Sequence, residues 1–197
     1  MRTYAIIPAR SGSKRFKNKN ITKLLNTPLF MHSINFANKL KFIDKIILTS
    51  DSKKYLNIAK DNKKLIKHLR SKKSSKDTSM EEHILRDLIK FFKIKKIDYP
   101  DCILWLRPTH PLRDKDTFNK AYNIFIRNKK TVMVVHKVDS RLFKSRKKFI
   151  YPINDKMKNK SMLRSQDTNP LYSIFSGEFF RLSKKIKINF LGKLKTY

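Results

Sequence analysis

The chain opens on YAIIPARSGSKRFKNKN, residues 4–20, and this stretch predicts the beginning of the fold. Its first four residues form a compact apolar run that suits a buried strand, and Pro8 ends that strand. Five cations follow within ten residues, around a glycine, Gly12, that stands between two serines. Backbone amides, hydroxyls and ammonium groups of this kind can replace the water around phosphate oxygens. Residues 10–20 are therefore predicted to form a phosphate loop.

Two well-known phosphate-binding motifs are excluded by spacing. The stretch matches neither the G-x-x-x-x-G-K-[ST] pattern nor the G-x-G-x-x-G pattern. From these residues alone, a solvated basic turn in a lysine-rich protein stays open as an alternative to a phosphate loop.

The composition is that of a globular chain with an unusual charge. Its 197 residues, 40% of them hydrophobic, can bury one sizeable core. The chain has 48 Lys and Arg against 15 Asp and Glu, which gives a net charge of +33. Such a charge is typical of proteins that bind nucleic acid, but the lysines are spread along the whole chain, as A/T-biased codon usage would also produce. We favour compositional bias and keep nucleic-acid binding as an alternative.

Cysteine usage and hydropathy limit the cellular compartments in which we expect the protein. The single cysteine, Cys102, cannot form an internal disulfide, which fits a reducing environment. No apolar run is long enough to span a bilayer, and the first residues predict a strand rather than a signal peptide. We expect a cytoplasmic protein without a membrane partner.

Predicted strands and helices alternate along the rest of the chain. Apolar runs predict strands at residues 45–49, 65–69, 102–106 and 131–135, and Trp105 is expected in the core. Helical periodicity predicts helices from Pro28, from about residue 53 to 60, from Ser79, and over about 115–128. This repetition predicts an α/β fold with an open, mostly parallel sheet and helices on both faces.

Helix starts are predicted from capping residues. Thr27 would cap the first helix with Pro28 in its first turn, and the stretch Ser50-Asp51-Ser52 would cap the second, with capping the favoured role of Asp51. Ser79-x-x-Glu82 reads as a capping box for the third helix.

Ligands of such sheets lie beyond the carboxyl ends of the strands. The loops at Arg10, Ser50, Arg70 and Arg107 would all meet there. Three of these loops carry an arginine, as a site for an anionic nucleotide needs. For Arg113, pairing with a nearby acid and binding a ligand are both open.

The opening stretch resembles the amino-terminal signature of the acylneuraminate cytidylyltransferases, also called CMP-sialic acid synthetases. That signature reads Ile-Pro-Ala-Arg-Gly-Gly-Ser-Lys followed by Lys-Asn; here Ser11 replaces the first glycine and Lys19-Asn20 supply the pair. Four further segments are similar to motifs of this family and extend the resemblance over nearly the whole chain: residues 49–52, 70–79, 106–113 and 163–167.

The resemblance implies a fold and a reaction. The fold would be nucleotide-diphospho-sugar transferase-like, a single domain over residues 1–197 in which 136–175 form a small dimerisation excursion. A basic loop without regular structure is the alternative for that excursion. The reaction would transfer CMP from CTP to a nonulosonic (sialic-type) acid and release pyrophosphate, with Mg²⁺ as cofactor and the protein as a homodimer.

The resemblance also implies site residues. Arg10 and Lys19 would be catalytic, because they would stabilise charge on the phosphorus oxygens and on the departing pyrophosphate. The nucleotide would be bound by Arg10, Ser11, Gly12, Ser13, Lys19, Asn20, Arg70 and Ser79. The sugar acid would be bound by Arg107, Thr109, Arg164 and Gln166.

Two departures from the family pattern bear on activity. The family usually has glutamine where this chain has Arg107, a longer and charged side chain that changes the sugar pocket. The family also has an Asp-Ile-Asp segment that binds the catalytic metal, and none follows Tyr197 in this sequence. Either another acid substitutes for it, or the chain is a truncated and inactive relative, so the metal ligands are unknown.

Overall fold

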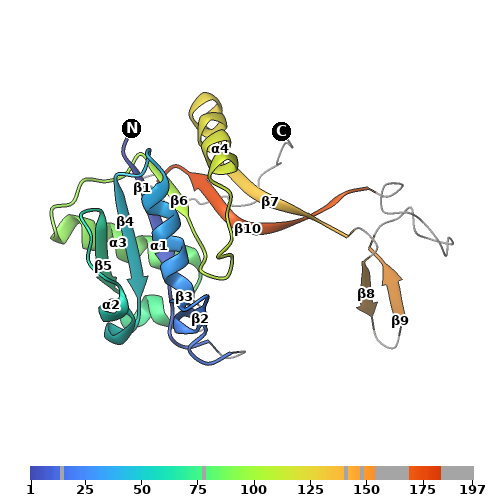
Figure 1. The fold of residues 1–197 in the computed structure, drawn as a ribbon, viewed down its shortest axis with the longest axis horizontal. Helices are drawn as coiled ribbons and strands as arrows, with labels where there is room; N and C mark the ends of the chain where they lie inside the picture. The colour runs from blue at the N-terminus through green and yellow to red at the C-terminus, as the bar shows by residue number, and fades with distance from the viewer. Residues whose placement is uncertain (14–15, 77–78, 140–141, 147–148, 154–168, 183–197) are drawn as a thin grey trace. The chain divides into compact units, whose positions relative to one another are not determined.

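Figure 1 shows the computed structural model of the chain, which describes residues 1–13, 16–76, 79–139, 142–146, 149–153 and 169–182. The chain divides into two compact units. Unit 1 holds residues 1–134 and 175–197, and unit 2 holds residues 135–174.

The described residues form one large sheet with the strand order β5-β4-β1-β6-β10-β7. These strands are β1 (Thr3–Pro8), β4 (Lys45–Ser50), β5 (Leu65–Leu69), β6 (Cys102–Trp105), β7 (Val132–Val138) and β10 (Leu171–Phe180). The pairs β1–β4, β1–β6 and β4–β5 are parallel. β10 is antiparallel to β6, with Glu178 opposite Trp105. The predicted open, mostly parallel sheet is confirmed; β10 is an addition that the alternation of elements did not predict.

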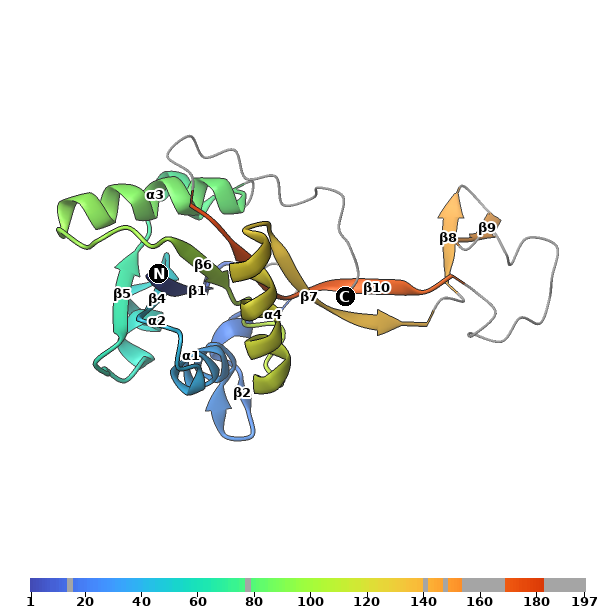
Figure 2. The same cartoon turned by 90° about the horizontal axis from the view of Figure 1, so that it is seen from above.

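Helices cover both faces of this sheet, as Figure 2 shows. One face is covered by α1 (Leu29–Lys39), α2 (Lys53–Ile58) and α4 (Lys115–Asn128), and the other by α3 (Glu81–Ile94). Successive side chains of β1 point to opposite faces of the sheet and contribute to both hydrophobic cores. Ala5 and Ile7 lie in the first core, on the side of α1, α2 and α4, whereas Tyr4 and Ile6 lie in the second core, on the side of α3. Trp105 lies in the second core, as expected.

Two predicted helix starts are wrong by one or two residues. Thr27 and Pro28 form the short strand β3, which pairs with β2 (Lys23–Leu24), so Pro28 is the N-cap and α1 begins at Leu29. The third helix begins after Met80 rather than Ser79.

The reason for the later start of α3 lies in the side chains. The hydroxyl of Ser79 donates to the carbonyl of Lys73 (2.9 Å), in the 3₁₀ helix η2 (Lys72–Ser75). The N–H of Met80 donates instead to Nδ1 of His83 (3.1 Å).

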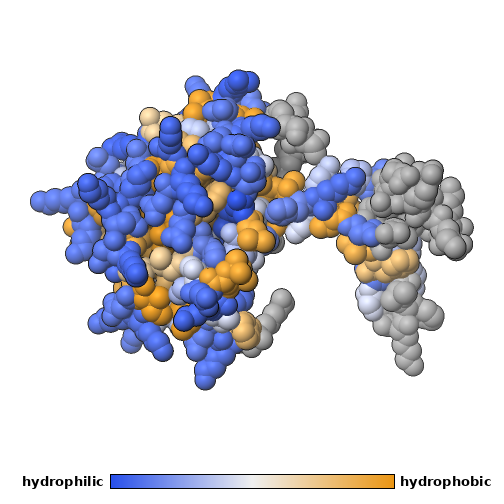
Figure 3. Space-filling model, in the orientation of Figure 1, coloured by the Kyte–Doolittle hydropathy of each residue, from blue (hydrophilic) through white to orange (hydrophobic). Residues whose placement is uncertain are grey.

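In unit 2 the strands β8 (Phe143–Arg146) and β9 (Phe149–Pro152) form an antiparallel pair. Several large hydrophobic side chains of this unit are exposed, and Figure 3 shows hydrophobic surface over these strands. They are Leu142, Phe143, Tyr151, Ile153 and Tyr172, exposed by 42–51%. Across the described ranges of both units, none of the helices is long and apolar enough to cross a bilayer.

Candidate functional site

The phosphate loop starts where β1 ends and is held by the neighbouring strand β4. The N–H of Ala9 donates to the carbonyl of Thr49 (2.9 Å). One residue past β4, the carboxylate of Asp51 accepts the N–H of Ser11 (2.8 Å) and its hydroxyl (3.1 Å). Asp51 is therefore an anchor of the loop, and its predicted role as a helix cap is wrong. Ser52 is the N-cap of α2, since its Oγ accepts from the N–H of Tyr55.

Arg10 and Asn20 brace the loop from within. The guanidinium of Arg10 donates to the carbonyls of Gly12 (2.6 Å) and Lys76 (3.1 Å). The buried amide of Asn20 donates to the carbonyl of Arg10 (2.7 Å). Asn20 thereby closes the loop onto the 3₁₀ helix η1 (Lys19–Ile21).

A cavity of about 680 Å³ opens beside this loop, at the carboxyl ends of β1 and β6. This volume is in the range of small-molecule sites. Seven of the residues predicted from the sequence line it: Arg10, Ser13, Lys19, Asn20, Ser79, Arg107 and Thr109. Pro8, Glu81, Ile84, Trp105 and Pro108 complete its wall. Segments far apart in the sequence thus meet at one cavity: Arg10 and Arg107 line it as expected, whereas Ser50 is absent from its lining.

Three of the predicted site residues that the structure describes do not line this cavity. Ser11 and Gly12 belong to the loop but are absent from the lining, and so is Arg70. Arg164 and Gln166 lie outside the described residues.

Arg70 is buried behind the phosphate loop. Its Nε donates to Oγ1 of Thr49 (3.1 Å) and its Nη2 to the carbonyl of the same residue (3.1 Å). Burial lowers the pKa of Arg70 to about 10, and the charge of Asp51 opposes this shift. Because that pKa stays well above neutrality, Arg70 is a fixed positive charge under the loop.

A buried histidine supports Thr49 and hence Arg70. Nδ1 of His68 lies 2.9 Å from Oγ1 of Thr49, and its Nε2 lies 3.7 Å from the carboxylate of Asp87. Because Thr49 already accepts from Arg70, its own proton is best donated to Nδ1 of His68, which leaves the ring proton on Nε2. Burial lowers the pKa of His68 to about 4, so the ring is neutral at physiological pH. No motif or spacing in the sequence indicated this support.

Arg107 stands in the cavity wall between two carboxylates. Nη2 donates to Oε1 of Glu81 (2.9 Å) at the start of α3, and Nη1 donates to Oε1 of Glu178 on β10. Glu178 is almost fully buried, which raises the pKa of its carboxyl, while the Arg107 charge opposes the rise. Neither carboxylate could be assigned to Arg107 from the sequence. For Glu178 the reason is that the register of β10 on β6 brings it to this place.

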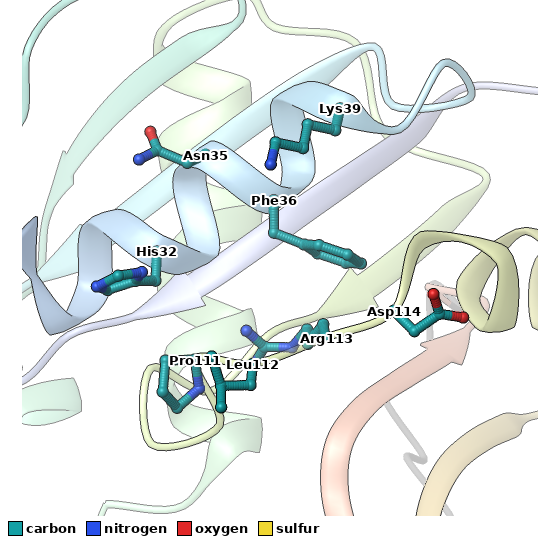
Figure 4. A pocket seen from close by; sticks show the side chains of 8 residues that line it. All are labelled: His32, Asn35, Phe36, Lys39, Pro111, Leu112, Arg113 and Asp114. Carbon is teal, nitrogen blue, oxygen red and sulfur yellow. The ribbon is translucent and has the colours of Figure 1, made fainter. Parts of the chain in front are cut away.

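Arg113 has a structural role. It donates to the carbonyls of Ser176 (2.8 Å) and Arg107 (2.7 Å) and to the hydroxyl of Ser33 (3.1 Å). The sequence left open that Arg113 pairs with a nearby acid. In the structure its partners are these two carbonyls and the hydroxyl instead. Arg113 also borders a second cavity of about 590 Å³, shown in Figure 4, between α1 and residues 111–114. That cavity contains no residue predicted for the nucleotide or the sugar.

The described residues do not provide a ready metal site. Within those ranges, no three Asp, Glu, His or Cys side chains come together as metal ligands. Asp51 and Glu81, the acids beside the loop and in the cavity wall, already bind Ser11 and Arg107.

Comparison with known proteins gives one family and several relatives. The family described as "Cytidylyltransferase" matches residues 4–171. A CMP-N,N'-diacetyllegionaminic acid synthase of Legionella pneumophila is 36% identical over 136 residues, 68% of this chain and 58% of the relative. A pseudaminic acid cytidylyltransferase of Campylobacter jejuni is 28% identical over 189 residues, 93% of this chain and 80% of the relative.

Solved structures share the fold. A CMP:2-keto-3-deoxy-manno-octonic acid synthetase complexed with CTP has a TM-score of 0.63 at 13% identity and covers 92% of this chain and 74% of its own. A 2-C-methyl-D-erythritol 4-phosphate cytidylyltransferase of Francisella tularensis has a TM-score of 0.62 at 13% identity, covering 92% and 73%.

Proposed function

Because the chain belongs to the cytidylyltransferase family, we propose that it transfers CMP from CTP to a nonulosonic acid and releases pyrophosphate. The observation that carries this proposal is the cavity at the carboxyl ends of β1 and β6, which collects Arg10 and Lys19 from the phosphate loop and Arg107 from the loop after β6. The proposed substrate class is supported by relatives named for legionaminic and pseudaminic acids.

In the proposed reaction the anomeric hydroxyl of the sugar acid attacks the α-phosphorus of CTP. A bond forms between that oxygen and phosphorus, the bond from phosphorus to the oxygen that bridges to the β-phosphate breaks, and the hydroxyl proton passes to water. Negative charge grows on the leaving pyrophosphate, and Arg10 and Lys19 are the cations assigned to stabilise it. Arg70 adds a fixed positive charge behind the loop, and Ser13 and Ser79 supply polar groups in the cavity.

The family resemblance implies Mg²⁺, which would neutralise phosphate charge. The described residues do not offer it a set of ligands, so no step is assigned to it. We further propose a cytoplasmic homodimer, with residues 136–175 at its interface. The exposed hydrophobic side chains of unit 2 support this proposal, since such residues gather where another chain binds.

The test is pyrophosphate release from CTP in the presence of Mg²⁺ and each of three acids: N-acetylneuraminic, pseudaminic and N,N'-diacetyllegionaminic acid. We expect release with at least one acid, none without an acid, and a loss of roughly a hundredfold or more in Lys19→Ala. Absence of release with every acid, from protein that still binds CTP, would favour an inactive relative. Salt-sensitive binding to unrelated DNA without CTP binding would favour the nucleic-acid alternative.

A further inference from the structure

The wall of the cavity carries an ion-pair cluster with a charge of its own. Arg107 is the centre, and Glu81 and Glu178 each bind one of its terminal nitrogens. One guanidinium against two carboxylates gives a cluster of net charge −1 when both acids are ionised. A cavity proposed to take an anionic sugar therefore presents a negative group beside its arginine.

The two carboxylates are held very differently. The side chain of Glu178 is 1% exposed, and it lies on β10 directly opposite Trp105. Removing it from Arg107 would leave a buried charge without compensation, which is strongly unfavourable. The side chain of Glu81 is 37% exposed, lies in the first turn of α3 and itself lines the cavity. Because its own side chain is partly exposed, Glu81 can turn into water at a lower cost than the buried Glu178 can.

The cluster thus has an inner contact that is fixed and an outer contact that can be exchanged. The outer contact joins Nη2 of Arg107 to one carboxylate oxygen of Glu81 at 2.9 Å. A substrate carboxylate entering the cavity offers the same chemical group to the same nitrogen. Guanidinium and carboxylate form strong, charge-assisted hydrogen bonds, so such an exchange preserves the interaction.

We propose that Arg107 binds the carboxylate of the sugar acid and that Glu81 occupies this position until the substrate displaces it. The inference rests on the proposed function and deepens it: it assigns the sugar carboxylate to Arg107, which stands where the resembled family has a neutral glutamine, and it names Glu81 as the group that the carboxylate displaces. Glu81 then acts as an internal competitor. Neutral ligands gain nothing from displacing it, so the exchange selects for acids over their esters.

The competition makes a prediction of unusual sign: removing the charge of a side chain that binds Arg107 in the cavity wall tightens substrate binding. In Glu81→Gln the shape of the side chain is kept and its charge is lost, so affinity for the sugar acid should rise about threefold. In Arg107→Gln affinity should fall about tenfold or more, because the cation is lost. Glu82→Gln is the matched control: it removes the same charge one residue along α3, from a carboxylate that pairs with Arg86.

Binding can be read from the protein itself. Trp105 is the single tryptophan of the chain and lines the same cavity, so its fluorescence reports ligand binding. The probes are the three nonulosonic acids named above and their methyl esters, each titrated with CMP present, which has no pyrophosphate to lose. A parallel CTP titration by calorimetry tests the nucleotide site independently, so failure of the proposed function is seen separately.

The proposal holds if Glu81→Gln binds an acid more tightly than the unaltered protein, while its ester and the Glu82→Gln control show no gain. The gain in affinity must also vanish in the double variant Glu81→Gln with Arg107→Gln. A gain that came only from the electrostatic potential of the whole cavity would persist in that variant. It is overturned if Glu81→Gln is unchanged or weaker, or if the ester gains equally. It is also overturned if the gain survives without Arg107, or if no acid binds to any variant. Should Arg107→Gln not fold, the comparisons of acid with ester and of Glu81 with Glu82 decide.

Discussion

Asp51 shapes the loop that is proposed to bind CTP, although its own charge repels anions. Replacing it with alanine has two opposing effects on CTP affinity. The loop loses a charged acceptor for the N–H and hydroxyl of Ser11, a contact of about 1.5–3 kcal/mol. The site also loses a negative charge, which by itself would favour CTP.

We expect the loss of loop geometry to dominate, so that Asp51→Ala raises the Kd for CTP about tenfold. Isothermal titration calorimetry measures this directly. Asp61→Ala is the control, because that carboxylate is 86% exposed and pairs only with Lys67 among the contacts described. Tighter CTP binding by Asp51→Ala would show that its charge matters more than its contact with Ser11.

His68 should make the stability of the protein depend on pH. Burial lowers the pKa of its ring to about 4 from the ordinary 6.5. Above pH 6.5 the ring is neutral in both the folded and unfolded chain, and it adds no dependence. As pH falls from 6.5 toward 4, the unfolded chain binds the proton more readily, so the free energy of unfolding decreases. At pH 5 the decrease due to His68 is on the order of 2 kcal/mol.

Urea unfolding at pH 7 and pH 5 measures this effect. The difference in stability between the two pH values should shrink in His68→Gln, which cannot titrate, and should remain in His32→Gln. His32 is partly exposed on α1 and is bonded to the carbonyl of Leu24. An unchanged difference in His68→Gln would assign the pH dependence to other groups.

At the scale of elements, β10 packs this closely against α4 only because it carries a glycine at position 177. A Cβ added to Gly177 would lie 2.4 Å and 2.7 Å from two ring carbons of Phe118 on α4. That ring is buried against Phe36 and Phe179, so it has little room to move. Gly177→Ala should therefore lower the free energy of unfolding by about 1–3 kcal/mol.

Chemical denaturation checks this prediction with a second glycine as control. A Cβ at Gly12 would meet only Nε of Arg10, at an ordinary 3.9 Å, and the glycines of the described chain have no positive φ. Gly12→Ala should leave stability nearly unchanged. Adding Phe118→Leu to Gly177→Ala should recover part of the loss, since the two residues share one space. Equal stability of the two alanine variants would contradict the packing argument.

Most elements could be predicted because their signals are local. Apolar runs located β1, β4 and β6, and helical periodicity located α4 to the residue. Helix caps were less predictable, because side chains such as those of Ser79 and Asp51 can bond to distant segments instead. β10 could not be placed, since its position depends on pairing with β6 more than 70 residues away.

The residues that line the candidate cavity were predictable to the same degree. Residues near the ends of predicted strands, such as Arg10 and Arg107, meet at the cavity as the topology required. Their partners were not predictable: the contact of Arg107 with Glu178 depends on the register of β10, and the support of Thr49 by His68 depends on that of β5.

At the scale of the whole molecule, the proposed dimer can be tested through unit 2. Phe143 and Tyr151 are exposed by 51% and 44%, so replacing both with glutamate should abolish association if they are buried between two chains. Sedimentation velocity should show a dimer for the unaltered protein and a monomer for the double variant. Leu112→Glu, at a side chain of unit 1 that is 74% exposed, is the control and should remain dimeric. A monomer at all concentrations would contradict the proposal.

The place of β10 also constrains how the protein is made on the ribosome. Although β7 precedes β10 in the chain, β10 lies between β6 and β7 in the sheet. Phe179 on β10 contacts the rings of Phe42, Phe118, Tyr122 and Phe125, with centroids 6.0–6.2 Å apart. Until this strand leaves the exit tunnel, the nascent chain displays an open edge of β6 and an aromatic cluster without its central ring. The chain under synthesis therefore forms an intermediate with exposed hydrophobic surface and an unpaired strand edge, and chaperones would bind it at this stage.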